Sequence, residues 1–167
     1  MKILGNKIKD LVAIQSSIKR MAHQVYENNL NENKIIIVGI SKKGYVLGQH
    51  IGAILKTISN IEITLVKLEI DKNNPLKNIK CDPPLKTLEN KSIVIVDDVL
   101  NTGSTLIYAV SYFLKIPVNQ INTAVMVNRN HKKFPVKADF KGISLSTSIN
   151  EHISVVLEGT EAGIYLS

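Results

Sequence analysis

A segment near the middle of the chain combines two adjacent acids with a glycine and several hydroxyl groups. Residues 94–106 read VIVDDVLNTGSTL. The apolar run predicts a buried strand that delivers Asp97 and Asp98 at its carboxyl end, where ligands bind in open α/β sheets. The turn at 101–105 predicts the start of a helix, whose free amides and positive dipole end attract a phosphate. Because the acids suit vicinal sugar hydroxyls or Mg²⁺, the segment predicts a ribose 5-phosphate site.

Each half of this segment also has a simpler interpretation. Two acids after a strand are able to bind a metal alone, and Thr-Gly-Ser-Thr is also typical of a helix cap. The thirteen contiguous residues of 94–106 join both halves, and this combination favours a sugar phosphate.

Helices and strands are expected to alternate around the site. Apolar residues at helical spacing predict the helices, the first with Asn6 as its cap, and β-branched runs predict the strands. The expected helices are at 6–28, 44–57 and 103–115, and the expected strands are at 34–40, 61–70, 92–97 and 121–127. This order indicates an α/β fold with a mainly parallel central sheet and right-handed crossovers.

Two other regions have weaker periodicity. Residues 71–91 contain three prolines, and such a segment is either a functional lid or a surface excursion. After residue 127, short strands are expected as a small antiparallel addition on one edge of the sheet. These strands are predicted at 136–140, 153–157 and 162–166.

Composition places limits on the class of protein. The 167 residues, of which 44% are hydrophobic and 21% charged, predict one globular domain over 1–167 and exclude a disordered chain. The single cysteine, Cys81, excludes an internal disulfide or a thiolate metal cluster. Apolar runs are too short for a membrane span, and the first ten residues lack the apolar core of a secretory signal. A cytoplasmic location is therefore expected.

Net charge leaves the partner open. Lys and Arg total 21 against 14 acids, giving +7, and only Arg20 and Arg129 are arginines. The scattered lysines fit a soluble surface, a phosphorylated substrate or a nucleic acid.

Residues 94–106 resemble the phosphoribosyl diphosphate (PRPP) binding motif of type I phosphoribosyltransferases. The resemblance implies a mainly parallel sheet flanked by helices, with a small C-terminal hood. It also implies that Asp97 and Asp98 are the catalytic acids, contacting the ribose hydroxyls and Mg²⁺. The 5-phosphate would be held by Asn101, Thr102, Gly103, Ser104 and Thr105.

An earlier segment, 38–44, is similar to the diphosphate loop of the same family. A glycine in a strand-to-helix turn is common, but its position before the acid pair adds weight. The resemblance implies that diphosphate is bound by Ser41, Lys42, Lys43 and Gly44.

Residues 126–147 resemble the group that is both pyrimidine-operon attenuator and uracil phosphoribosyltransferase. This implies that Arg129, Phe140 and the main chain near Ile143 lie beside the nucleobase. Core packing is the alternative for Phe140, and an exposed loop position is the alternative for His131.

Three positions depart from the patterns of the family. The Tyr-Arg-Asp-Asp signature of the pyrimidine group is replaced at 68–74 by LEIDKNN, in which Lys72 is the candidate substitute for the arginine. Asn128 stands where that group commonly has Asp. Asn101 stands where purine-salvage members usually have the Asp that assists proton transfer, so purine salvage is disfavoured.

The resemblance implies an enzyme that transfers the 5-phosphoribosyl group of PRPP to a nucleobase, a pyrimidine such as uracil, to give UMP and diphosphate. Mg²⁺ is the expected cofactor, a homo-oligomer (dimer) is the expected assembly, and no membrane is involved. The alternatives are a nucleotide-sensing, RNA-binding regulator of pyrimidine genes, and a binding-only relative with weak catalysis.

Overall fold

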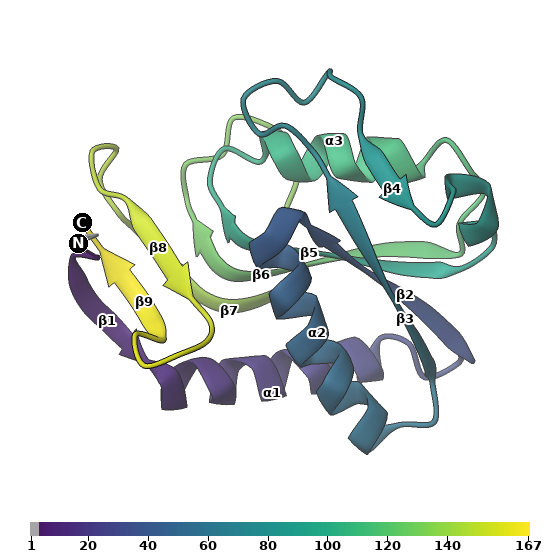
Figure 1. Cartoon of the computed structure of the whole chain (residues 1–167), viewed down its shortest axis with the longest axis horizontal. Helices are drawn as coiled ribbons and strands as arrows, with labels where there is room; N and C mark the ends of the chain where they lie inside the picture. The colour runs from purple at the N-terminus through teal and green to yellow at the C-terminus, as the bar shows by residue number, and fades with distance from the viewer. Residues whose placement is uncertain (1–3) are drawn as a thin grey trace.

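The computed structural model describes residues 4–167 and shows an α/β fold with two sheets (Figure 1). The large sheet has the order β4-β3-β2-β5-β6-β7, in which every pair is parallel except β3 and β4. Its strands are β2 (Lys34–Ile40), β3 (Glu62–Glu69), β4 (Lys80–Asp82), β5 (Ser92–Leu100), β6 (Gln120–Arg129) and β7 (Phe140–Leu145). The predicted fold class is confirmed. The domain predicted for 1–167 includes residues 1–3, which lie outside the described residues.

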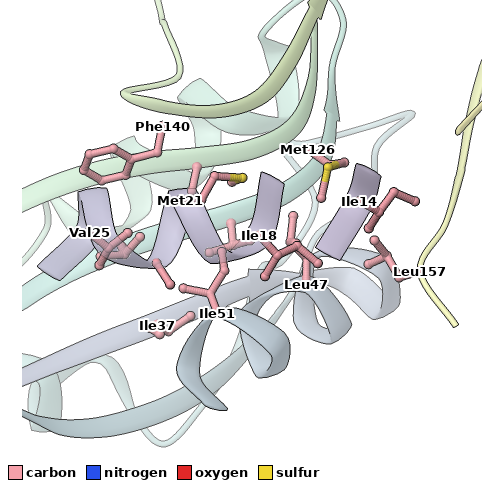
Figure 2. Close-up of a cluster of buried hydrophobic side chains, with 14 of the residues drawn as sticks. Ile14, Ile18, Met21, Val25, Ile37, Leu47, Ile51, Met126, Phe140 and Leu157 are labelled. Atoms are coloured by element: carbon pink, nitrogen blue, oxygen red, sulfur yellow. The ribbon is translucent and has the colours of Figure 1, made fainter. Parts of the chain in front are cut away.

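Three helices cover the large sheet. Helices α1 (Leu11–Glu27) and α2 (Ser41–Ile58) pack together on one face, and α3 (Ser104–Phe113) packs on the other. Figure 2 shows α1 between α2 and the strand that carries Phe140, with Ile18 and Met21 inside the larger cluster of buried side chains. None of the helices in residues 4–167 is long and apolar enough to cross a membrane.

The small sheet contains β1 (Asn6–Asp10), β9 (Gly163–Leu166) and β8 (Ile153–Val156), all antiparallel in the order β1-β9-β8. Figure 1 shows it beside the large sheet, with both ends of the described chain close together. The prediction of an antiparallel edge on the large sheet was wrong, because β8 and β9 pair with β1 instead. The predicted strand at 136–140 was also misplaced, since β7 begins at Phe140 and runs parallel to β6.

Two further boundaries differ from the sequence predictions. The first helix begins at Leu11, and its cap is Asp10, whose Oδ1 accepts from the amide of Ala13 at 2.8 Å, so Asn6 is not the cap. Residues 6–10 instead form β1 because they pair with β9. The 71–91 segment also contains regular structure, namely β4 and a 3₁₀ turn at Leu85–Leu88.

The order of strands in the large sheet changes direction at β2, because β3 is added on one side of it and β5 on the other. After β2 it crosses through α2 to β3 on one side, and β5 then pairs on the other side of β2. The loops after β2 and β5 therefore emerge side by side at the carboxyl edge. Ligands bind at such a switch point in open α/β sheets.

Candidate functional site

The acid pair lies within the last residues of β5. The carboxyl groups of Asp97 and Asp98 belong to residues that are only 4% and 6% exposed. The amide of Asp98 donates to Asp97 Oδ1 at 2.9 Å, which fixes the first carboxylate against the backbone. Two buried, adjacent carboxylates at a sheet edge need a positive or hydrogen-bonding partner.

Burial is the main influence on the protonation of Asp97. It raises the pKa of Asp97 to about 7, with Lys72 acting to lower it and Asp98 acting to raise it. Burial lowers the pKa of Lys72, but the two carboxylates raise it more, so the net shift is upward. A buried carboxyl with a raised pKa beside a specific charged partner is typical of functional sites.

Two lysines from different parts of the chain neutralise the acid pair. Lys72 Nζ lies 3.2 Å from Asp97 Oδ1 and 3.6 Å from Asp98 Oδ1. Lys43 Nζ, from the first turn of α2, lies 3.4 Å from Asp98 Oδ2. Because Lys72 comes from the 71–91 segment, that segment already reaches the acids.

The predicted phosphate turn borders a small cavity of about 60 Å³. Its walls include all five predicted phosphate-binding residues, 101–105, together with Asp97 and Lys72. A cavity of this volume suits a small anion, since it has room for only a few water molecules. The structure therefore brings the predicted phosphate turn and one acid into a single pocket.

A backbone contact orients the phosphate turn. The carbonyl of Thr102 accepts from the amides of Lys133 and Phe134 at 2.8 and 3.1 Å. Across a trans peptide the next amide, that of Gly103, points the opposite way. Gly103 has a φ of +87°, and a Cβ there would lie 2.7 Å from Val136, so glycine is required on both counts.

The two helices that begin at the site lack side-chain caps, whereas α1 has one. Neither α2 nor α3 has a side-chain hydrogen bond from its N-cap residue. The amide of Ser104 donates to Thr102 Oγ1 at 3.2 Å, so the amides that follow it in the first turn of α3, and those of the first turn of α2, are the ones available to an anion. Ser41 at the start of α2 has a φ of +53°, a strained conformation for a residue other than glycine. Such strain is often found at ligand sites.

The predicted diphosphate residues lie at this second helix start. Gly44 packs against β5, and a Cβ there would lie 2.4 Å from the carbonyl oxygen of Val96. Lys42 and Lys43 line a groove of about 350 Å³ between α2 and β8. The structure thus places residues 41–44 next to the acid pair.

The three residues predicted beside the nucleobase lie outside the cavity at the phosphate turn, although Arg129 contacts its wall at Asn101. Phe140 is buried in the core near Met21 and Val25 (Figure 2), which is the packing alternative. Ile143 packs against the same core and borders a shallow groove with Arg20. Arg129 is buried, and its guanidinium donates to Asn101, Thr147, Ser148 and Glu151.

Sequence reasoning left two contacts unassigned. Lys72 was only a candidate substitute for an arginine, but it bridges both acids. His131 is half-buried rather than exposed, and its Nε2–H donates to the carbonyl of Thr147 at 2.6 Å. The only sequence signal for either contact is a polar residue near a predicted site. This signal does not show which group the side chain contacts.

The acid pair suits a magnesium ion that is held mainly by substrate and water. Among residues 4–167, no group of three or more His, Cys, Asp or Glu side chains could hold a metal. Mg²⁺ commonly takes one or two carboxylates and completes its shell with water and substrate phosphates. The ammonium of Lys72 stands 3.2 Å from Asp97, so this position already favours a cation.

Comparisons with known proteins agree on the fold and the family. The pattern of the phosphoribosyl transferase domain matches residues 5–158. The chain is 36% identical to the bifunctional protein PyrR of Fusobacterium nucleatum, over 95% of this chain and 94% of that protein. It is 31% identical to the bifunctional protein PyrR of Clostridium acetobutylicum, over 95% and 93%. Its fold is similar to the hypoxanthine phosphoribosyltransferase of Trypanosoma cruzi, with a TM-score of 0.81 at 14% identity over 99% and 98% of the two chains.

Proposed function

The chain belongs to the phosphoribosyltransferase family, and from this premise we propose that it transfers the 5-phosphoribosyl group of PRPP to a pyrimidine base, converting uracil to UMP and releasing diphosphate. One observation carries the proposal. The buried acid pair adjoins an uncapped, glycine-containing helix start at the switch point of the sheet. Such a site suits a phosphorylated pentose.

In the proposed reaction, the bond from C1 of ribose to diphosphate breaks ahead of attack by the base nitrogen. Asp97 and Asp98 accept hydrogen bonds from the ribose hydroxyls, and their charge stabilises the positive charge that develops on the ring. The 101–105 amides hold the 5-phosphate. Such orientation of two reactants is able to supply about 7–11 kcal/mol of the barrier.

The leaving diphosphate is assigned to the start of α2. The free amides of the first turn of α2 and the ammonium groups of Lys42 and Lys43 stabilise its negative charge. Mg²⁺, where it is bound by Asp97 and Asp98, supplies further charge neutralisation. The 71–91 segment, which already contacts the acids through Lys72, excludes water as a lid.

Support for a pyrimidine base comes from the relatives, and one polar side chain is a candidate for contact with the edge of a base of either class. The two protein relatives described above, at 31% and 36% identity, are both named bifunctional protein PyrR, whereas the hypoxanthine phosphoribosyltransferase, at 14% identity, shares only the fold. Asn128, at the carboxyl end of β6, is 5% exposed. Its Oδ1 has no hydrogen-bond partner within residues 4–167, and its Nδ2 reaches Ser144 only at 3.5 Å. A buried amide with free capacity is able to read a base edge that offers both a donor and an acceptor.

A panel of bases tests the proposal. The protein is incubated with PRPP, Mg²⁺ and uracil, cytosine, hypoxanthine or guanine, and diphosphate release is measured. We expect release with uracil and a sharp fall in single-turnover rate for Asp98→Asn, with an unchanged circular dichroism spectrum. Release with a purine alone would overturn the pyrimidine assignment, and no release with any base would leave only the binding role.

A second candidate function is RNA binding by the same chain. The observation in its favour is the net charge of +7, together with relatives that are named bifunctional. Gel shifts with pyrimidine-operon leader RNA test this candidate. They are repeated from about 50 to about 200 mM salt, because contacts with phosphate weaken steeply over this range. Binding that is absent at low salt contradicts it.

A further inference from the structure

Arg129 connects the phosphate turn to a second loop. At the end of β6, its Nη1 donates to Asn101 Oδ1 at 3.0 Å. Its Nε donates to Thr147 Oγ1 at 2.9 Å. Its Nη2 donates to the carbonyls of Ser148 and Glu151 at 3.1 and 2.8 Å. One buried guanidinium therefore joins residue 101 to the 147–151 loop, which links β7 to β8.

The arrangement leaves Arg129 little capacity to bind a base. All three of its nitrogens donate to protein acceptors, and the residue is 8% exposed. The planar fork matches acceptors on two loops at once, and a lysine ammonium is unable to reproduce this geometry. Thr147 has a second contact with His131, whose Nε2–H donates to its carbonyl at 2.6 Å, so the start of the far loop is joined to the segment after β6.

We propose that Arg129 is a positioning residue that couples the phosphate turn, through Asn101, to the 147–151 loop on the nucleobase side of the site. This inference rests on the proposed function. A phosphate held at 101–105 orders Asn101, Asn101 fixes one side of the Arg129 fork, and the fork orders the loop that leads into β8. Binding energy gained at the phosphate is thereby used to organise the base side, as expected for two thermodynamically linked subsites.

This coupling has a specific signature in binding. Ribose 5-phosphate occupies the phosphate turn alone, whereas a nucleoside monophosphate occupies both sides. The dissociation constant of ribose 5-phosphate divided by that of the nucleoside monophosphate reports how well the base side is organised once the phosphate is bound. A larger ratio means a better organised base side. A purely structural arginine would lower the melting temperature and leave this ratio unchanged.

The test uses calorimetric titration of the full chain with ribose 5-phosphate and with the tightest of uridine, cytidine, guanosine and inosine monophosphates. For Arg129→Lys, we expect the ratio to fall about tenfold, within the usual size of coupling between sites, and ribose 5-phosphate affinity to change less than about threefold. Arg20→Lys is the matched control. Arg20 also forks two backbone carbonyls, those of Lys141 and Gly142, but lies away from the phosphate turn, and we expect its ratio to match the wild type.

Thr147→Val supplies a second variant in case Arg129→Lys does not fold. It removes one acceptor of the fork without touching the turn, and we expect the same direction of change. In the double variant, the effects should not add, because both act through one linkage. Additive effects would indicate that Arg129 contacts the base directly and would overturn the inference.

The remaining outcomes separate the inference from the proposed function. Wild-type binding of both ligands, with an unchanged ratio in Arg129→Lys and Thr147→Val, overturns the inference alone. A wild-type protein that binds neither ligand overturns the proposed function, and the inference with it.

Discussion

At the scale of single residues, the ionised carboxylate of Asp97 lowers the stability of the folded state, because it is buried. Its pKa is raised from 3.8 to about 7, chiefly by burial, so folding favours the protonated form. Its contribution to stability is therefore present below about pH 4, is lost as the pH rises toward 7, and stays lost above that.

Asp97→Asn should reverse this loss. We expect the variant to be more stable than the wild type by roughly 1–3 kcal/mol at pH 8, and by much less at pH 5. Urea unfolding of both proteins at the two pH values measures the difference. A stability difference independent of pH would show that the carboxyl does not titrate in this range.

Lys72 opposes the effect of burial on Asp97, and its removal should be visible in the pH dependence of catalysis. Because Lys72 lowers the pKa of Asp97, Lys72→Met should move the acidic limb of the kcat/KM profile to higher pH. Lys77→Met is the control, since Lys77 pairs with Asp71 at 3.0 Å. Equal shifts in the two variants would point to a general effect of net charge.

At the scale of elements, the site depends on how closely α2 approaches β5. A Cβ on Gly44 would lie 2.4 Å from the Val96 carbonyl oxygen, and backbone at this position has no room to move. Gly44→Ala should therefore push the first turn of α2, with Lys43, away from Asp98. We expect a loss of about 1–3 kcal/mol in unfolding free energy and weaker diphosphate binding.

Gly52→Ala is the matched control in the same helix. A Cβ there would meet side-chain methyl groups at 3.5 Å or more, which is ordinary contact. We expect a stability gain of up to about 1 kcal/mol from helix propensity. Denaturant unfolding and calorimetric titration with diphosphate measure both variants, and a Gly44→Ala protein with wild-type stability would contradict the close packing.

The sequence predicted β5 and α3 with small errors at their ends, at 92–97 and 103–115. β5 and α3 are contiguous with the acids and the phosphate turn, so local pattern was sufficient to place 94–106 at a strand-to-helix junction. β1 was predicted as helix because its pairing partner, β9, lies at the other end of the described chain. The Arg129 and Lys72 contacts escaped prediction for the same reason, since spacing along the chain does not reveal partners distant in sequence.

At the scale of the whole molecule, ligands that bind only the folded state should raise its melting temperature. At a nucleotide concentration about 100 times the dissociation constant, the gain is about 2.7 kcal/mol, or roughly 5–10 °C for a domain of this size. We expect UMP to produce this shift and uridine, which lacks the phosphate, to produce much less. A scanning fluorimetry series that ranks uridine with UMP would argue against the phosphate turn. The expected homo-oligomer remains a prediction, for which sedimentation velocity is the measurement.

The pairing of β1 with β9 has a consequence for the order in which the protein forms on the ribosome. β1 is translated early, but its partner follows more than 150 positions later, at 163–166. Ribosomes add about 5–20 residues per second, so β9 is synthesised roughly 10–30 s after β1. All residues of the large sheet and of the phosphate turn have been translated before then, since the last strand of that sheet ends at Leu145. A ribosome that stalls ahead of β9 would thus release a polypeptide with a finished phosphate turn and an unfinished small sheet.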